Sequence, residues 1–124
     1  MGDDEKANLT FVDKWIRLHN TDPQRMVDEC YAPDAVIVVP GVEEFGVARL
    51  RELESEGAAR AGGRETRAVR VVSSGDVVVV EGTTTESADG DGGAESAWCV
   101  VLTIRNGLIV SDHAYLNTHR PHAS

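Results

Sequence analysis

Two titratable side chains, Asp112 and His19, occupy positions where acid–base chemistry can arise. Asp112 interrupts the largely apolar run 108–116, and His19 follows Trp15 by four residues, which places both on one face of a helix. Removal from water raises the pKa of a carboxyl group, whereas a neighbouring imidazolium lowers it, so such a pair would titrate near neutrality. These residue types therefore point to general acid or base catalysis.

Asp112 belongs to the second strand of a predicted hairpin. Asn106 and Gly107 tolerate the positive φ angles of a tight two-residue turn, and β-branched and aromatic residues flank them. The same criteria predict four strands in the second half of the chain, over residues 66–73, 77–87, 95–104 and 108–118.

His19 and Trp15 belong to a predicted N-terminal helix that runs through residue 19. Asp22 is suited to cap a second, short helix, and Gly57 is suited to end a third. The predicted helices end at residues 19, 30 and 57, a loop covers 58–63, and a β-branched strand covers 35–39.

The length of 124 residues predicts one domain with a single core. Three N-terminal helices interrupted by one strand, followed by a four-stranded meander, predict an α+β fold in which helices pack on one face of a bent sheet. Such a sheet tends to enclose a pocket between its concave face and the helices. Residues 119–124 are expected to form a flexible tail.

The net charge of −9 comes from 21 acidic and 12 basic residues without a polybasic cluster, so nucleic acid and anionic membranes are not expected partners. No apolar run approaches the ~20 residues of a membrane span, and the acidic start is unlike a signal peptide. We expect a cytoplasmic location. Cys30 and Cys99 are interpreted as small buried side chains. The four histidines lack metal-site spacing and no phosphate-binding loop is present, so neither a metal nor another cofactor is expected.

Several segments, taken in their order and spacing, resemble one superfamily. These are Trp15 with His19-Asn-Thr-Asp22, Tyr31-Ala-Pro-Asp-Ala-Val36, Gly46-Val-Ala-Arg-Leu50, and the run from Asn106 to Tyr115. The chain resembles the nuclear transport factor 2-like (NTF2-like) superfamily, in its branch of SnoaL-like polyketide cyclases, ketosteroid isomerases and limonene-epoxide hydrolases. The resemblance implies a cone-shaped fold, an apolar pocket, and a homodimer formed through the outer face of the sheet.

The resemblance does not carry over the catalytic residues of the best-known relatives. The base of ketosteroid isomerases would fall at about Val39, their tyrosine at Trp15 and their second acid near Val100. The last acid of the epoxide hydrolases would fall at Ala114, and their Arg-x-Asp pair in 81–84. Those two mechanisms are therefore not expected, whereas the SnoaL-like cyclases, which vary more at their sites, remain open.

If Ala114 faces the pocket, as the resemblance implies, alternation along the strand turns Asp112 inward as well. The expected pocket residues are Trp15, Tyr31, Val39, Trp98, Val100 and Ala114. The expected dimer contacts, on the opposite face, are Cys99, Val101, His113 and Tyr115.

Two functions follow from this arrangement. In the first, the pocket binds a small apolar or polycyclic molecule, and Asp112 and His19 converge to serve a cofactor-independent cyclase, isomerase or hydratase. In the second, Asp112 bonds to the backbone or an arginine at the pocket mouth, and His19 only meets the dipole of its helix. The domain would then be a non-catalytic ligand-binding or protein-interaction module.

Overall fold

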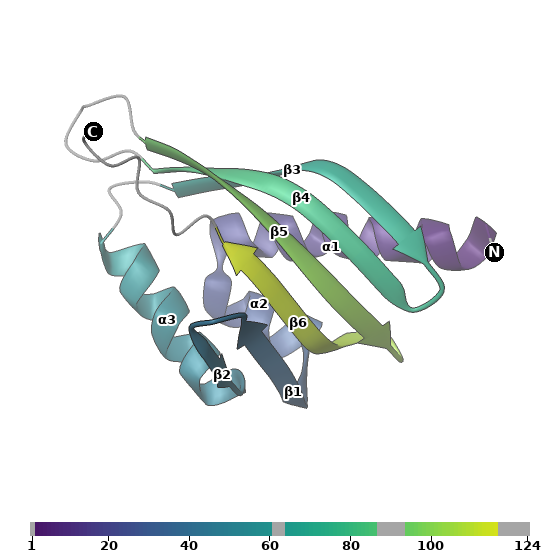
Figure 1. Cartoon of the computed structure of the whole chain (residues 1–124), viewed down its shortest axis with the longest axis horizontal. Helices are drawn as coiled ribbons and strands as arrows, with labels where there is room; N and C mark the ends of the chain where they lie inside the picture. The colour runs from purple at the N-terminus through teal and green to yellow at the C-terminus, as the bar shows by residue number, and fades with distance from the viewer. Residues whose placement is uncertain (1, 61–63, 87–93, 117–124) are drawn as a thin grey trace.

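The computed structural model describes residues 2–60, 64–86 and 94–116, and it confirms the predicted α+β architecture (Figure 1). Its elements in chain order are α1 (Gly2–Thr21), α2 (Pro23–Cys30), β1 (Tyr31–Val39), β2 (Glu43–Phe45), α3 (Val47–Arg60), β3 (Arg64–Ser74), β4 (Val77–Glu86), β5 (Ala94–Arg105) and β6 (Leu108–Leu116). The predicted tail, 119–124, lies outside the described residues.

The strands form one bent sheet in the order β2-β1-β6-β5-β4-β3. Neighbouring strands are antiparallel except β1 and β6, which run parallel. The predicted tight turn joins β5 to β6, with φ angles of 53° at Asn106 and 78° at Gly107. The long strands curve over α1, while α2 and α3 lie beside β1 and β6 (Figure 1). The helices therefore cover the concave face of the sheet.

Most boundaries differ from the prediction by one or two residues, and three differences are larger. β1 begins at Tyr31 rather than residue 35, and its pairing with β6 is irregular between Tyr31 and Val36, around Pro33, which has no N–H to donate. The short β2 was not predicted. α3 continues past Gly57 to Arg60. Gly57 is buried inside the helix, and a Cβ there would lie 2.7 Å from Arg64 Nη1, so the glycine leaves room for this side chain.

The core lies between the helices and the concave face. Its largest fully buried side chains are Met26, Leu102, Ile109, Val27, Val78, Val80 and Cys30. The burial of Cys30 agrees with its interpretation as a small core side chain.

The opposite, convex face carries the side chains expected at a dimer contact. Tyr115 is half exposed, and Cys99, Val101 and His113 are partly exposed. No partner chain is present, so the homodimer stays a prediction. Among the described residues, no helix combines the length and apolar character needed to cross a membrane.

Gly82 gives a test of how closely the sheet packs on the pocket. A Cβ at this position would collide with the Trp98 ring and lie 2.5 Å from the Arg67 carbonyl oxygen. Gly82→Ala is therefore expected to lower the free energy of unfolding by roughly 1–3 kcal/mol, measured by urea denaturation. The control is Gly46→Ala, whose Cβ would meet nothing closer than 3.9 Å. Equal stability of the two variants would contradict the packing described here.

Candidate active site

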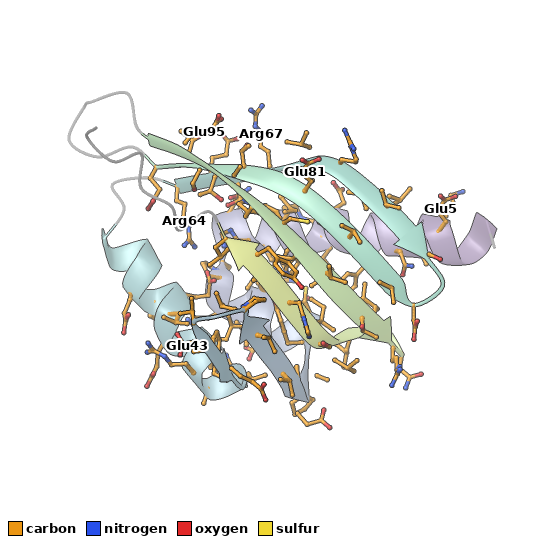
Figure 2. The ribbon with its side chains drawn as sticks, viewed as in Figure 1. Glu5, Glu43, Arg64, Arg67, Glu81 and Glu95 are labelled. Carbon is orange, nitrogen blue, oxygen red and sulfur yellow. The ribbon has the colours of Figure 1, made fainter. Side chains whose placement is uncertain are left out.

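A cavity of about 350 Å³ lies between the helices and the concave face of the sheet. Most of its wall is apolar, including Trp15, Ile37, Leu50, Trp98, Val100 and Ala114. Polar side chains at the wall are His19, Tyr31, Glu54, Arg64, Thr66, Thr84 and Asp112. In Figure 2, Arg64 points from β3 toward the helices, whereas Arg67 lies on the other side of the strand. The size and lining suit one small organic molecule.

Asp112 is buried at the wall of this cavity and is held by one side chain. Tyr31 Oη donates a hydrogen bond of 2.7 Å to Asp112 Oδ2, and Trp15 Nε1 donates to Tyr31 Oη at 3.3 Å. The other carboxylate oxygen, Oδ1, is buried and has no hydrogen-bond partner among the described residues. Asp112 thus has one oxygen fixed in place and one without a partner.

Burial raises the pKa of Asp112 from its usual 3.8 to about 6. The hydrogen bond from Tyr31 and the charge of His113 lower this pKa, and the charge of Glu54 raises it. Burial and the Asp112 charge hold the pKa of Tyr31 well above its usual value, so its hydroxyl remains a donor. Near neutral pH the site therefore holds an ionised but poorly solvated carboxylate, the state suited to a general base.

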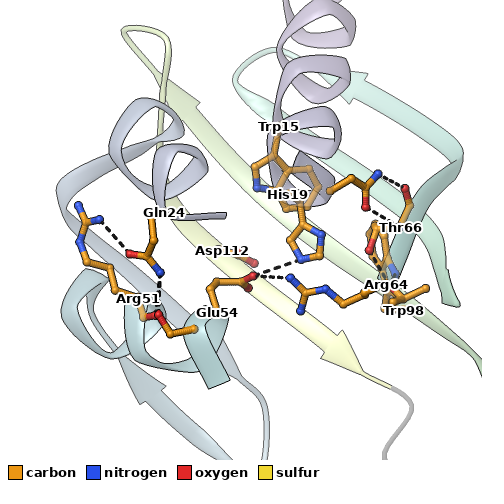
Figure 3. A network of polar contacts seen from close by, with 12 residues as sticks. Trp15, His19, Gln24, Arg51, Glu54, Arg64, Thr66, Trp98 and Asp112 are labelled. Atoms are coloured by element: carbon orange, nitrogen blue, oxygen red, sulfur yellow. Dashed lines mark hydrogen bonds and ion pairs between the residues drawn. The ribbon is translucent and has the colours of Figure 1, made fainter. Parts of the chain in front are cut away.

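A second polar cluster joins α1, α3 and β3 on the same cavity (Figure 3). Glu54 Oε1 lies 3.4 Å from His19 Nε2 and 3.0 Å from Arg64 Nη2. Burial lowers the pKa of His19 most; Glu54 raises it, Arg64 lowers it, and the Asn20 amide raises it. His19 is therefore a neutral imidazole near pH 7, paired with a carboxylate that the Arg64 guanidinium also holds.

The two tryptophans are fixed by contacts with each other and with polar partners. Their rings meet edge to face, with centroids 6.2 Å apart. Trp98 Nε1 donates to Thr84 Oγ1 at 2.9 Å, and Thr84 Oγ1 lies 2.9 Å from Thr66 Oγ1. Asn20 at the end of α1 exchanges two hydrogen bonds with the backbone of Thr66. The network fixes the position of α1, and hence of Trp15, against the sheet.

Most residues expected at the pocket do line the cavity: Trp15, His19, Tyr31, Trp98, Val100, Asp112 and Ala114. Val39 does not; it pairs with Glu43 where β1 turns into β2, past the cavity, and Ile37 takes the place at the wall. The first of the two functions considered from the sequence had His19 and Asp112 converge, and the structure gives each of them another partner. In the described part of the chain no ion pair joins them, because Glu54 partners His19 and Tyr31 partners Asp112.

Sequence reasoning missed four polar residues of the cavity: Glu54, Arg64, Thr66 and Thr84. Two glycines in the sequence could have indicated where side chains pack closely around the cavity. Gly57 and Gly82 leave room for Arg64 and Trp98 respectively, and glycine inside a helix or strand often marks such a close approach.

Comparison with known families agrees with this fold and cavity. Residues 12–112 match the model of the SnoaL-like domain. The chain therefore belongs to the SnoaL-like family, within the NTF2-like superfamily, as its sequence resemblance predicted.

Solved structures with the same fold include proteins named as enzymes. A loop-truncation variant of IdmH superposes with a TM-score of 0.79 at 18% identity, covering 87% of this chain and 91% of that one. An epoxide hydrolase of M. tuberculosis, described as LEH-like, gives 0.75 at 20% identity, with coverages of 90% and 84%. A protein of Jannaschia sp. CCS1, assigned as a SnoaL-like polyketide cyclase, gives 0.77 at 15%, with 90% and 86%. No curated protein matches the chain. At these identities the similarities establish the fold alone.

The raised pKa of Asp112 predicts a pH-dependent cost to stability. The folded chain holds this proton more tightly than the unfolded chain, so the contribution of Asp112 to stability is fully present below about pH 4 and is lost as the pH rises through about 6. Asp112→Asn removes this loss and keeps an oxygen that accepts from Tyr31. The stability of Asp112→Asn minus that of wild type, both measured as the free energy of unfolding, is expected to be up to about 3 kcal/mol larger near pH 8 than near pH 4.

Urea denaturation at both pH values measures this difference. The matched control is Asp34→Asn, which alters an exposed aspartate on β1. Its stability difference from wild type is expected to change little between the two pH values. An equally flat result for Asp112→Asn would contradict the burial of an ionisable carboxyl group at this position.

Proposed function

We propose that this chain is a cofactor-independent enzyme that removes a proton from a small, largely apolar molecule, with Asp112 as the general base. The observation that carries the proposal is the unpartnered Oδ1 of a buried carboxylate at the wall of an apolar cavity. Proton removal of this kind is a step that cyclases and isomerases share. Glu54, the other carboxylate of the cavity, is engaged by Arg64 and His19 and is therefore less available as a base.

Tyr31 acts in this proposal as a positioning residue. Its hydroxyl fixes Oδ2, and its hydrogen bond keeps the pKa of Asp112 from rising further. A base that titrates near 6 is mostly ionised at neutral pH yet remains a good proton acceptor, because it is poorly solvated. The walls formed by Trp15 and Trp98 would exclude water and hold a flat apolar substrate against the carboxylate. The names of the structural relatives, an epoxide hydrolase and a cyclase, agree with an enzymatic role.

The proposal can be tested without the natural substrate. 5-Nitrobenzisoxazole is a small, planar, mostly apolar molecule whose ring opens, with cleavage of its N–O bond, when a base removes its carbon-bound proton. Wild-type protein is expected to accelerate this reaction, with kcat/KM rising with pH to a plateau above about 6. Asp112→Asn is expected to lower kcat/KM at least ~100-fold, while Asp34→Asn keeps the wild-type value.

The variant Tyr31→Phe provides a second test, because its expected effect on the pH profile would not occur if Tyr31 had only a structural role. Loss of the hydrogen bond that lowers the pKa of Asp112 is expected to move the midpoint of the pH profile upward. Wild-type kcat/KM in Asp112→Asn, or no acceleration by the wild type, would overturn the enzymatic proposal. The second result would favour the non-catalytic ligand-binding module.

A further inference from the structure

The polar atoms of the cavity leave a distinctive set of unused hydrogen-bonding positions. The Tyr31 hydroxyl donates to Asp112 and accepts from Trp15, and the Thr84 hydroxyl is engaged by Trp98 and Thr66. Two buried side-chain nitrogen or oxygen atoms of the described residues have no partner, His19 Nδ1 and Asp112 Oδ1. Both residues line the same cavity. Unpartnered buried polar atoms are costly, so a ligand that satisfies them gains affinity.

The protonation of His19 follows from its partner. Its Nε2 faces Glu54 Oε1, which also accepts from Arg64. An ionised carboxylate can only accept hydrogen bonds, so Nε2 carries the proton. Since burial lowers the pKa of His19, the ring is neutral and Nδ1 presents a lone pair. Both unpartnered atoms are therefore hydrogen-bond acceptors at neutral pH.

The charges at the wall select against anions. Arg64 is the cation among the described lining residues, and Glu54 already neutralises it. Asp112 adds a further negative charge once it ionises. A carboxylate or phosphate would meet two acceptors and an excess of negative charge. A neutral molecule with a hydroxyl group supplies the donor that the cavity lacks.

We propose that His19 Nδ1 accepts a hydrogen bond from a hydroxyl group of the substrate, so that the cavity selects neutral hydroxylated apolar molecules. This inference rests on the proposed function, in which Asp112 Oδ1 receives the proton that leaves the substrate. Recognition of a hydroxyl group then falls to His19, and Glu54 and Arg64 act by holding its ring in the required tautomer.

Three bicyclic probes of similar size test this selectivity: 2-naphthol, its methyl isostere 2-methylnaphthalene, and the anion 2-naphthoate. Their binding to wild-type protein near neutral pH is measured by competition with a fluorescent apolar dye. We expect 2-naphthol to bind roughly tenfold more tightly than 2-methylnaphthalene. We expect 2-naphthoate to bind most weakly of the three.

His19→Phe removes the nitrogen acceptor, keeps an aromatic ring and leaves Asp112 Oδ1 in place, so the preference for 2-naphthol over 2-methylnaphthalene is expected to fall several-fold. His19→Gln offers a carbonyl acceptor and is expected to retain part of the preference. The matched control is His113→Phe on the outer face of β6, which keeps the wild-type preference. Nitrogen-15 NMR of wild-type protein provides a readout independent of any variant. It is expected to show His19 protonated at Nε2, with the Nδ1 resonance shifted by 2-naphthol and not by 2-methylnaphthalene.

Failure of this inference is distinguishable from failure of the proposed function. Equal wild-type binding of 2-naphthol and 2-methylnaphthalene, absence of binding by both, or a proton on Nδ1 would overturn the role of His19. A preference of wild-type size in His19→Phe would overturn it as well. None of these results depends on turnover, and 5-nitrobenzisoxazole carries no hydroxyl group. Loss of that turnover in Asp112→Asn would therefore still support the base.

Discussion

The hydrogen bond from Tyr31 to Asp112 is the interaction on which the site depends. A buried carboxylate with no partner at all would cost several kcal/mol, and here one hydroxyl group donates to one of its two oxygens. Parallel pairing of β1 with β6 brings the two strands together, and Trp15 fixes the tyrosine from α1. Three elements from both halves of the chain thus hold one oxygen and leave the other without a partner.

The two carboxylates of the cavity have opposite environments. Glu54 faces Arg64 and His19, which compensate its charge. Asp112 faces an apolar wall and one hydroxyl group, which leaves its charge poorly compensated. Carboxyl groups in such different surroundings have different roles: the compensated one holds neighbouring groups in place, and the other can exchange a proton. In our interpretation, Glu54 orients His19 while Asp112 performs the chemistry.

Much of this architecture could be predicted because local signals are strong where the strands and helices begin and end. The turn at Asn106 and Gly107 and the Asp22 cap rest on short-range geometry. The inward orientation of Asp112 followed from alternation along the strand together with the family resemblance. The partners of the site residues could not be predicted in the same way. Glu54 lies on an ordinary amphipathic helix, and its contact with His19 depends on how two helices pack.

Gly57 shows how a glycine can mislead the prediction of where a helix ends. Glycine commonly ends a helix, yet here it makes room inside α3 for the Arg64 side chain. Val39 shows a second limit, because the resemblance aligned it only approximately with a pocket position and does not say how far along the strand the cavity extends. Both errors concern tertiary packing, which one-dimensional patterns do not encode.

The role of Asp112 as a base depends on the raised pKa of its buried carboxyl group. Carbon-13 NMR of the side-chain carboxyl carbon, assigned by its loss in Asp112→Asn, measures this pKa in the intact chain. We expect a titration midpoint of about 6. A midpoint close to the usual 3.8 would show that water or another donor solvates the carboxylate, and would contradict the proposed role of Asp112.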